Sequence, residues 1–194
     1  MSNAIVWFRN DLRLADNPAL QAALEGGFTP IPVYLHAPEE EGDWAPGAAS
    51  NTWRHHSLRQ LDDGLRARGS RLLLRTGPSK QALLELIHDT SAEAVFWNRK
   101  YEPATQPRDA DIKQSLKAEG LQVESFNGAL LFEPWTLATQ QGGPYKVFTP
   151  FWRNALGQWR TPALSEARAS MLPVPTELAS EPLDAFKFLP RLGW

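Results

Sequence analysis

Polar and charged side chains follow directly after a short apolar run near the start of the chain. Residues 4–8 are apolar, and the next five positions hold Arg9, Asn10, Asp11 and Arg13. Guanidinium, amide and carboxylate groups together can hold an anionic or polar ligand. The same groups can instead pair with one another and brace the loop. For Arg9, Asn10 and Asp11 we carry both interpretations forward.

A second polar group, residues 98–102, follows another apolar run, residues 94–97. In this group Arg99 can meet a negative ligand group, Glu102 can accept a hydrogen bond from a ring, and Asn98 supplies an amide. The alternative is a solvated loop with a Glu–Arg pair. His36 ends a third apolar run, where it faces either a ligand cleft or a surface turn.

The chain carries no recognisable catalytic machinery. The sequence lacks a catalytic triad, a glycine-rich phosphate loop and a His pair in a metal-binding context. The adjacent His55 and His56 point about 100° apart on a helix, so they do not chelate one ion from one face. We therefore expect no catalytic residue and no metal ligand.

Short apolar runs that alternate with amphipathic stretches must position these side chains. The expected strands are residues 4–8, 31–36, 71–75, 94–97 and 122–126, and the expected helices are 18–25, 50–68, one after Ser79, and 107–119. Alternation at these lengths predicts a doubly wound, Rossmann-like α/β fold with a five-stranded parallel sheet and helices on both faces. Ligands of such sheets bind beyond the carboxyl ends of the strands, where the polar groups lie.

The pattern changes after Gly128. We expect an α/β domain over residues 1–130 and an interdomain segment with an extended linker over 131–194. Residues 145–159 are aromatic-rich and are expected to be partly helical from Thr149. The proline-rich stretch 161–190 reads as a linker that lies across a surface. The apolar ending, residues 192–194, suggests a truncated chain.

Composition narrows the class of protein. The 194 residues are 42% hydrophobic and 22% charged, which is typical of one globular domain with a tail. The net charge of -2 argues against the phosphate backbone of DNA as the main partner of this chain. The absence of Cys excludes disulfides and thiolate sites. With no signal peptide or membrane span in the sequence, we expect a cytoplasmic location.

Four segments carry a resemblance to a known family. They are "VWFRNDLRLADNPAL", "WRHHSLRQLDDGL", "FWNRKYEPATQPRD" and "YKVFTPFWRNAL". Together, and in this order, they resemble the amino-terminal domain of the DNA photolyase and cryptochrome family. The likeness runs from Ile5 to about Trp159 and continues weakly in the tail.

The resemblance implies a two-part protein. Its amino-terminal α/β domain holds an antenna pigment, which is a folate, a deazaflavin or a flavin according to the member. A helical carboxy-terminal domain holds FAD and the damaged DNA. The antenna passes excitation to FAD, which donates an electron to a pyrimidine dimer and splits it. The helical domain is absent here, so we expect this chain alone to be inactive and to bind no FAD.

Two departures from the family pattern leave the pigment open. Folate-binding members tend to carry an Asn-Glu pair where this sequence has Ala104-Thr105. Some deazaflavin and flavin binders carry an Arg near the position of Ser50-Asn51. The candidate pigment contacts, by this resemblance, are Arg9, Asn10, Asp11, His36, Asn98, Arg99 and Glu102.

Three functions remain open from the sequence. The first is the antenna-binding part of a deoxyribodipyrimidine photo-lyase that repairs cyclobutane pyrimidine dimers. The second is the same part of a cryptochrome photoreceptor, and the third is a free-standing nucleotide-binding module. The expected partners are the helical FAD-binding domain and, through it, damaged DNA. We also expect the aromatic residues between Tyr145 and Trp152 to form an interdomain seam, which predicts a dimer when it is left uncovered.

Overall fold

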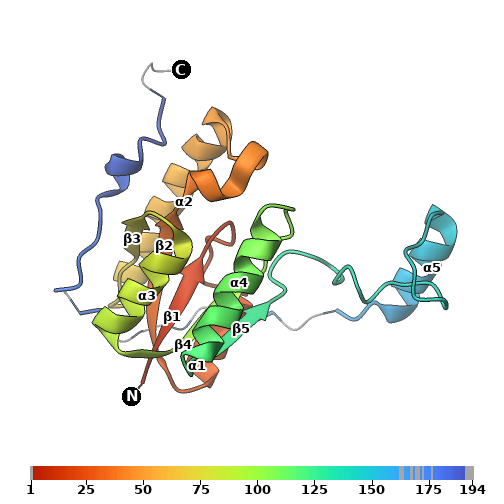
Figure 1. Ribbon diagram of the computed structural model, residues 1–194, viewed down its shortest axis with the longest axis horizontal. Coiled ribbons are helices and arrows are strands. Elements are labelled where there is room, and N and C mark those ends of the chain that lie inside the picture. Colours follow the sequence, from red (N-terminus) through yellow and green to blue (C-terminus); the bar gives the residue numbers. More distant parts are fainter. Residues whose placement is uncertain are drawn as a thin grey trace. The chain divides into compact units, whose positions relative to one another are not determined.

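The chain divides into two compact units. The computed structural model describes residues 2–161, 164–166, 168, 171, 173–175 and 177–190. Residues up to Gly128, together with those from Ser165 onward, form an α/β unit, and Ala129–Leu164 form a second unit. Figure 1 shows both units, which we describe separately.

A five-stranded parallel sheet forms the centre of the α/β unit, which confirms the predicted fold. The strand order is β3-β2-β1-β4-β5, and every neighbouring pair is parallel. The strands are β1 (Asn3–Phe8), β2 (Thr29–His36), β3 (Leu73–Thr76), β4 (Ala92–Asn98) and β5 (Gln122–Phe126). The strand order reverses between β1 and β4, so a ligand site is expected at their carboxyl ends.

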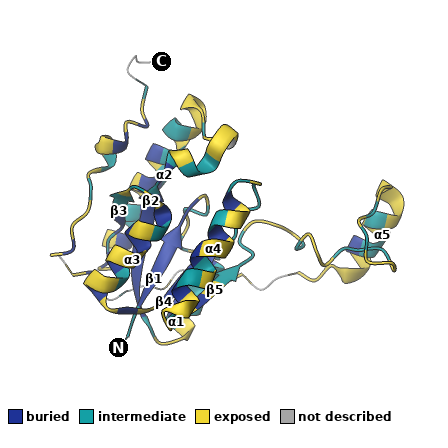
Figure 2. Ribbon diagram, viewed as in Figure 1, coloured by how far each residue is buried: buried dark blue, intermediate teal, exposed yellow. Residues whose placement is uncertain are grey.

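Helices cover both faces of the sheet. One core joins the sheet to α3 (Ser79–Thr90) and α4 (Thr105–Ala118) through Leu83, Leu86, Ile112 and Leu116. The opposite core joins it to α1 (Pro18–Glu25) and α2 (Ala48–Arg66) through residues that include Leu20, Leu58 and Leu65. The three central strands, β1, β2 and β4, are almost entirely buried between these two layers, as Figure 2 shows. This double burial explains why the strands read as unbroken apolar runs.

Local signals set most of the element boundaries. Asn17 caps α1, because its Oδ1 accepts a hydrogen bond from Leu20 N at 3.2 Å, and Pro18 opens the helix as predicted. The predicted start of β3 at residue 71 is two residues early. Leu72 N donates to the Asp62 carboxylate of α2 at 2.8 Å instead of to β2. A 3-10 helix, η1 (Pro38–Trp44), lies between β2 and α2 and gave no periodic signal.

Within the α/β unit, the described residues after Ser165 include a stretch that lies along the outer edge of β3. Glu181 N donates to Leu74 O of β3 at 2.9 Å, and the Glu181 carboxylate accepts from Thr76 N at 2.6 Å. Phe186, in the short helix η2 (Leu183–Phe186), and Phe188 are buried. The segment thus shields the outer edge of β3 from pairing with other strands. Pro162 and the apolar ending at 192–194 lie outside the described residues.

The second unit is built around α5 (Phe148–Gln158), which confirms the helix predicted from Thr149. Asn154 Nδ2 donates to the Tyr145 hydroxyl at 2.7 Å, and the rings of Phe148 and Trp152 stack at 6.1 Å between centroids. Both of these stacked rings are exposed. Across the described ranges, no helix is long and apolar enough to cross a membrane.

Candidate ligand-binding site

A groove of about 790 Å³ lies beyond the carboxyl end of β1. A volume of this size suits a small-molecule ligand. Two segments supply most of its walls, namely the loop after β1 and the first turns of α2. Glu102, from the loop after β4, completes the lining. The described lining residues are Arg9, Asn10, Asp11, Leu12, Arg13, Glu41, Pro46, Ala49, Ser50, Trp53, Arg54, Ser57 and Glu102.

One face of α2 forms the most open wall of the groove. Ser50, Trp53, Arg54 and Ser57 are spaced i, i+3, i+4 and i+7, which places them on the same side of the helix. The Trp53 side chain is 76% exposed. A large exposed aromatic ring beside a cation can stack on a planar ligand and hold a negative group. This wall therefore favours a flat, polar or anionic ligand.

The Arg9 side chain forms the floor of the groove, where other residues hold it in place. Its guanidinium forms an ion pair with Asp109 of α4, donates to the Asn98 carbonyl, and lies 5.0 Å from the Trp7 ring centroid. Burial lowers the pKa of Arg9 from its ordinary value, and the neighbouring Asp109 opposes that shift. These contacts join β1, β4 and α4 at one point.

Asp11 and Asn98 belong to one bracing network. Asn98 Nδ2 donates to Asp11 Oδ2 at 2.5 Å and to Asn17 Oδ1 at 2.9 Å, and Asn98 Oδ1 accepts from Ala19 N at 3.2 Å. Asn98 is 3% exposed and does not lie among the described residues that line the groove. Asp11 lines the groove while it also accepts from Arg9 N at 2.9 Å.

Two other candidate residues lie away from the groove. Arg99 donates to the carbonyl of Ser125 and, at 3.1 Å, to its hydroxyl, on the far side of β4. The His36 ring lies 4.9 Å from the ring of Phe186 and 4.8 Å from that of Phe188, under the segment that covers β3. Burial, followed by the charge of Arg54, lowers the pKa of His36. Their predicted pigment contacts stay predictions.

The first turns of α2 were not among the predicted contacts. The residues 50, 53, 54 and 57 carry a signal that identifies them, because their helical spacing puts two serines, a tryptophan and an arginine on one face. Glu41, from η1, carries no such signal. It reaches the groove because η1 brings it to Lys100, whose Nζ lies 3.1 Å from Glu41 Oε2.

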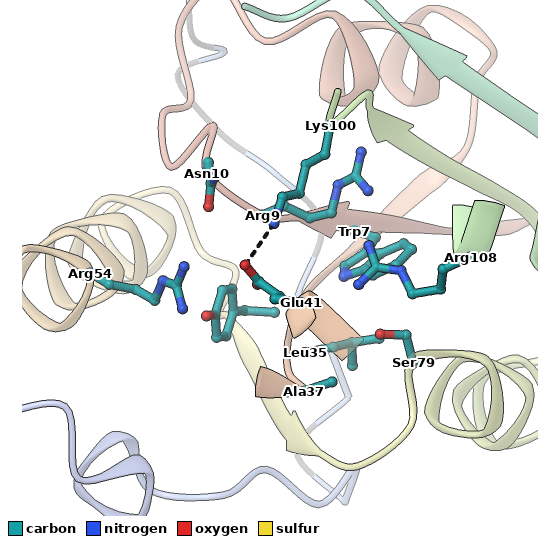
Figure 3. Close-up of a pocket in the computed structure, with 11 residues that line it drawn as sticks. Trp7, Arg9, Asn10, Leu35, Ala37, Glu41, Arg54, Ser79, Lys100 and Arg108 are labelled. Carbon is teal, nitrogen blue, oxygen red and sulfur yellow. Dashed lines mark ion pairs between the residues drawn. The ribbon is translucent and has the colours of Figure 1, made fainter. Parts of the chain in front are cut away.

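A much smaller cavity, of about 20 Å³, lies next to the groove (Figure 3). It shares Arg9, Asn10, Glu41 and Arg54 with the groove and adds Trp7 and Tyr34 among its walls. Burial raises the pKa of Tyr34 to about 12. No group of three or more His, Asp or Glu side chains suited to a metal ion occurs in the part of the chain that the structure describes.

Comparison with known proteins identifies the family. The family model for DNA photolyase matches residues 4–173. The chain belongs to the DNA photolyase family. The match includes the five strands, the loops that line the groove and the helix of the second unit.

Photolyases and cryptochromes both occur among the similar proteins. A deoxyribodipyrimidine photo-lyase of Agrobacterium fabrum is 44% identical over 186 residues, which cover 96% of this chain and 38% of that protein. Cryptochrome-1 of Arabidopsis thaliana is 44% identical over 154 residues, which cover 79% of this chain and 22% of that protein.

A solved structure agrees with the fold. The crystal structure of a bacterial class III photolyase from Agrobacterium tumefaciens matches with a TM-score of 0.90 and 43% identity, over 98% of this chain and 39% of that chain. The chain therefore spans less than half the length of these relatives.

Proposed function

We propose that this chain is the antenna-binding region of a DNA photolyase. The observation that carries the proposal is the groove of about 790 Å³ at the carboxyl ends of the strands, with the exposed Trp53 ring beside Arg54. A planar pigment fits this volume and this lining. When bound, such a pigment absorbs light and passes its excitation to a second chromophore.

The residues that would hold the pigment come from three segments. Trp53 and Arg54 supply a stacking surface and a positive charge, Asn10 supplies an amide, and Glu102 supplies an acceptor. Arg9 and Asp11 hold the floor through their contacts with Asp109 and Asn98. Energy transfer requires fixed distance and orientation rather than proton transfer, and a braced floor with an open wall meets that requirement.

The rest of the proposal concerns the parent protein. Members of this family act through FAD in a carboxy-terminal domain and bind DNA. We propose that the parent of this chain is a deoxyribodipyrimidine photo-lyase in which that domain binds FAD and damaged DNA. The exposed aromatic rings of α5 suit either that domain or a second copy of this chain. The cytoplasm is the proposed location, which the lack of Cys favours.

A binding experiment tests the antenna proposal directly. The purified chain is mixed with a reduced folate, a deazaflavin, FMN or ATP, and the protein is separated by gel filtration before its absorption spectrum is recorded. We expect one pigment to travel with the protein and ATP not to do so. Retention of ATP alone would instead support a nucleotide-binding module.

A cryptochrome remains the second candidate, because Cryptochrome-1 of Arabidopsis thaliana is as similar in identity as the photolyase of Agrobacterium fabrum. The full-length parent distinguishes the two functions. Illumination of the parent with DNA that contains cyclobutane dimers is expected to restore the pyrimidines. Binding of FAD without any repair would favour the photoreceptor.

A further inference from the structure

The small cavity beside the groove has room for one atom-sized group. Its volume is about 20 Å³, which is close to the space that a single water molecule needs. Figure 3 shows that its walls come from β1, η1, α2, α3 and the loop after β4. Tyr34 and Leu35 of β2 and Arg108 of α4 complete the lining, and we refer to this cavity as the inner chamber.

Two buried side chains that line the inner chamber, Trp7 and Arg9, each carry a donor without an acceptor in the described part of the chain. Trp7 is 2% exposed and Arg9 is 5% exposed. Among the described residues, neither Trp7 Nε1 nor Arg9 Nε has a hydrogen-bond partner. A buried donor without a partner destabilises the fold. These two donors therefore need an acceptor that the described side chains do not supply.

One of the four cations that line the inner chamber has no carboxylate within ion-pair distance among the described residues. Three of the four cations that line it are each matched by a carboxylate, in the pairs Arg9–Asp109, Arg108–Glu40 at 3.3 Å and Lys100–Glu41 at 3.1 Å. The fourth, Arg54, forms no ion pair within the described ranges. It contacts the Tyr34 hydroxyl and lies 5.9 Å from the Phe188 ring centroid.

We propose that the inner chamber binds one anionic acceptor atom, either a halide or a single oxygen of a carboxylate or phosphate. Trp7 Nε1 and Arg9 Nε donate to this atom, and Arg54 supplies the balancing charge. The anion is either free in solution or the acidic end of a ligand that lies in the adjoining groove. A cation is disfavoured, because both orphaned groups are donors.

Indole NMR signals of the 194-residue chain test this proposal. The Trp7 Nε1–H resonance is assigned by its loss in Trp7→Phe, a change that keeps an aromatic ring in the core. Chloride and inorganic phosphate are then titrated at constant ionic strength, with tetrafluoroborate, a weak hydrogen-bond acceptor, as the balancing anion. We expect a saturable shift of the Trp7 resonance, while that of Trp135, in the second unit, does not move.

Two arginines of α2 provide a matched pair of variants. Arg54→Gln removes the cation that has no ion pair among the described residues and is expected to weaken anion binding about tenfold, through the loss of one charge-assisted contact. Arg59→Gln removes an exposed guanidinium that does not line the chamber and is expected to leave binding unchanged. Equal effects of the two variants would mean that the anion responds only to the general charge of the helix.

A second set of titrations distinguishes a free anion from the acidic end of a ligand in the groove. A reduced folate and FMN carry carboxylate and phosphate groups, and a Trp7 shift with one of them but not with free anions assigns the chamber to the end of the groove ligand. Binding that shifts the Trp53 resonance and not that of Trp7 overturns the inner-chamber proposal and leaves the antenna proposal intact. The absence of a Trp7 response to any probe means that the chamber holds water only.

Discussion

The loops after β1 and β4 and the first turns of α2 border the same groove, yet they use their polar side chains differently. In the loop after β1, Asp11 binds Asn98, the last residue of β4, and Arg9 binds Asp109 of α4. On α2, Trp53 is 76% exposed, and Arg54 has no ion pair among the described residues. The loops therefore brace the sheet, while the helix presents groups that a ligand can meet.

This difference follows from burial. A polar group that is removed from water must find partners inside the protein, or the fold loses stability. The Asn98 residue is 3% exposed, and its side chain bonds three residues, Asp11, Asn17 and Ala19. A dense run of polar residues at the end of a strand is thus as suited to holding the fold together as to holding a ligand. The predictions below test this division of roles.

The largest effect is expected from Arg9→Met. This change removes one partner of a buried ion pair and leaves Asp109 Oδ2 and the Asn98 carbonyl without their donor, while Arg108 still donates to Asp109 Oδ1 at 2.7 Å. We expect the free energy of unfolding to fall by about 3 kcal/mol. Urea denaturation measures the loss. The double variant Arg9→Met, Asp109→Asn is the control and should recover part of it, whereas a loss below about 1 kcal/mol would contradict a buried pair.

Asn98→Ala is expected to lower the free energy of unfolding by about 2 kcal/mol, because it leaves Ala19 N without its acceptor and removes one buried donor each from Asn17 Oδ1 and Asp11 Oδ2. The same denaturation experiment measures it. Asn10→Ala serves as the control, since Asn10 is exposed, and should change stability by no more than about 0.5 kcal/mol. If the two variants behave alike, the loop network does not brace the sheet.

Trp53→Ala tests whether the α2 face of the groove contacts the ligand. We expect the free energy of unfolding to stay within about 0.5 kcal/mol of that of the unmodified chain, because the side chain is exposed. The affinity for the pigment that the chain retains should fall about tenfold through the loss of stacking area. Fluorescence titration measures the affinity. Trp135→Ala, which removes a 64% exposed ring outside the groove, should leave affinity unchanged.

The smallest effect concerns pH and the segment that covers β3. Burial lowers the folded pKa of His36 below its ordinary value of 6.5, Arg54 lowers it further, and Glu39, Glu41 and Glu181 oppose the shift. As the pH falls, His36 therefore binds a proton in the unfolded chain at a higher pH than in the folded chain. Its contribution to the free energy of unfolding is present above pH 6.5 and declines as the pH falls from 6.5 toward the pKa of the folded chain.

A comparison of unfolding free energies at several pH values isolates this contribution. His55 also has a lowered pKa and acts in the same direction, so the pH profile of the unmodified chain does not separate the two histidines. His36→Gln should flatten part of the decline below pH 6.5, and His55→Gln should flatten the remainder. An unchanged pH profile in His36→Gln would remove His36 from the interpretation.

The sequence alone determined the elements and their layers. The apolar runs predicted all five strands, and the Asn17-Pro18 pair predicted the start of α1. These features depend on residues within a few positions of one another, such as a cap and the first turn of its helix. Polar residues at the carboxyl ends of β1 and β4 were also visible, and the parallel sheet brings those ends together.

Only the tertiary structure decided which polar side chains are satisfied and which stay open. Arg9 and Asp109 are 100 positions apart, and the strand order that places β4 beside β1 brings them into contact. The same order buries Asn98 and turns Arg99 toward β5. Local sequence patterns do not encode such pairings, because the partner of a buried polar group is selected by whichever distant segment the fold places against it.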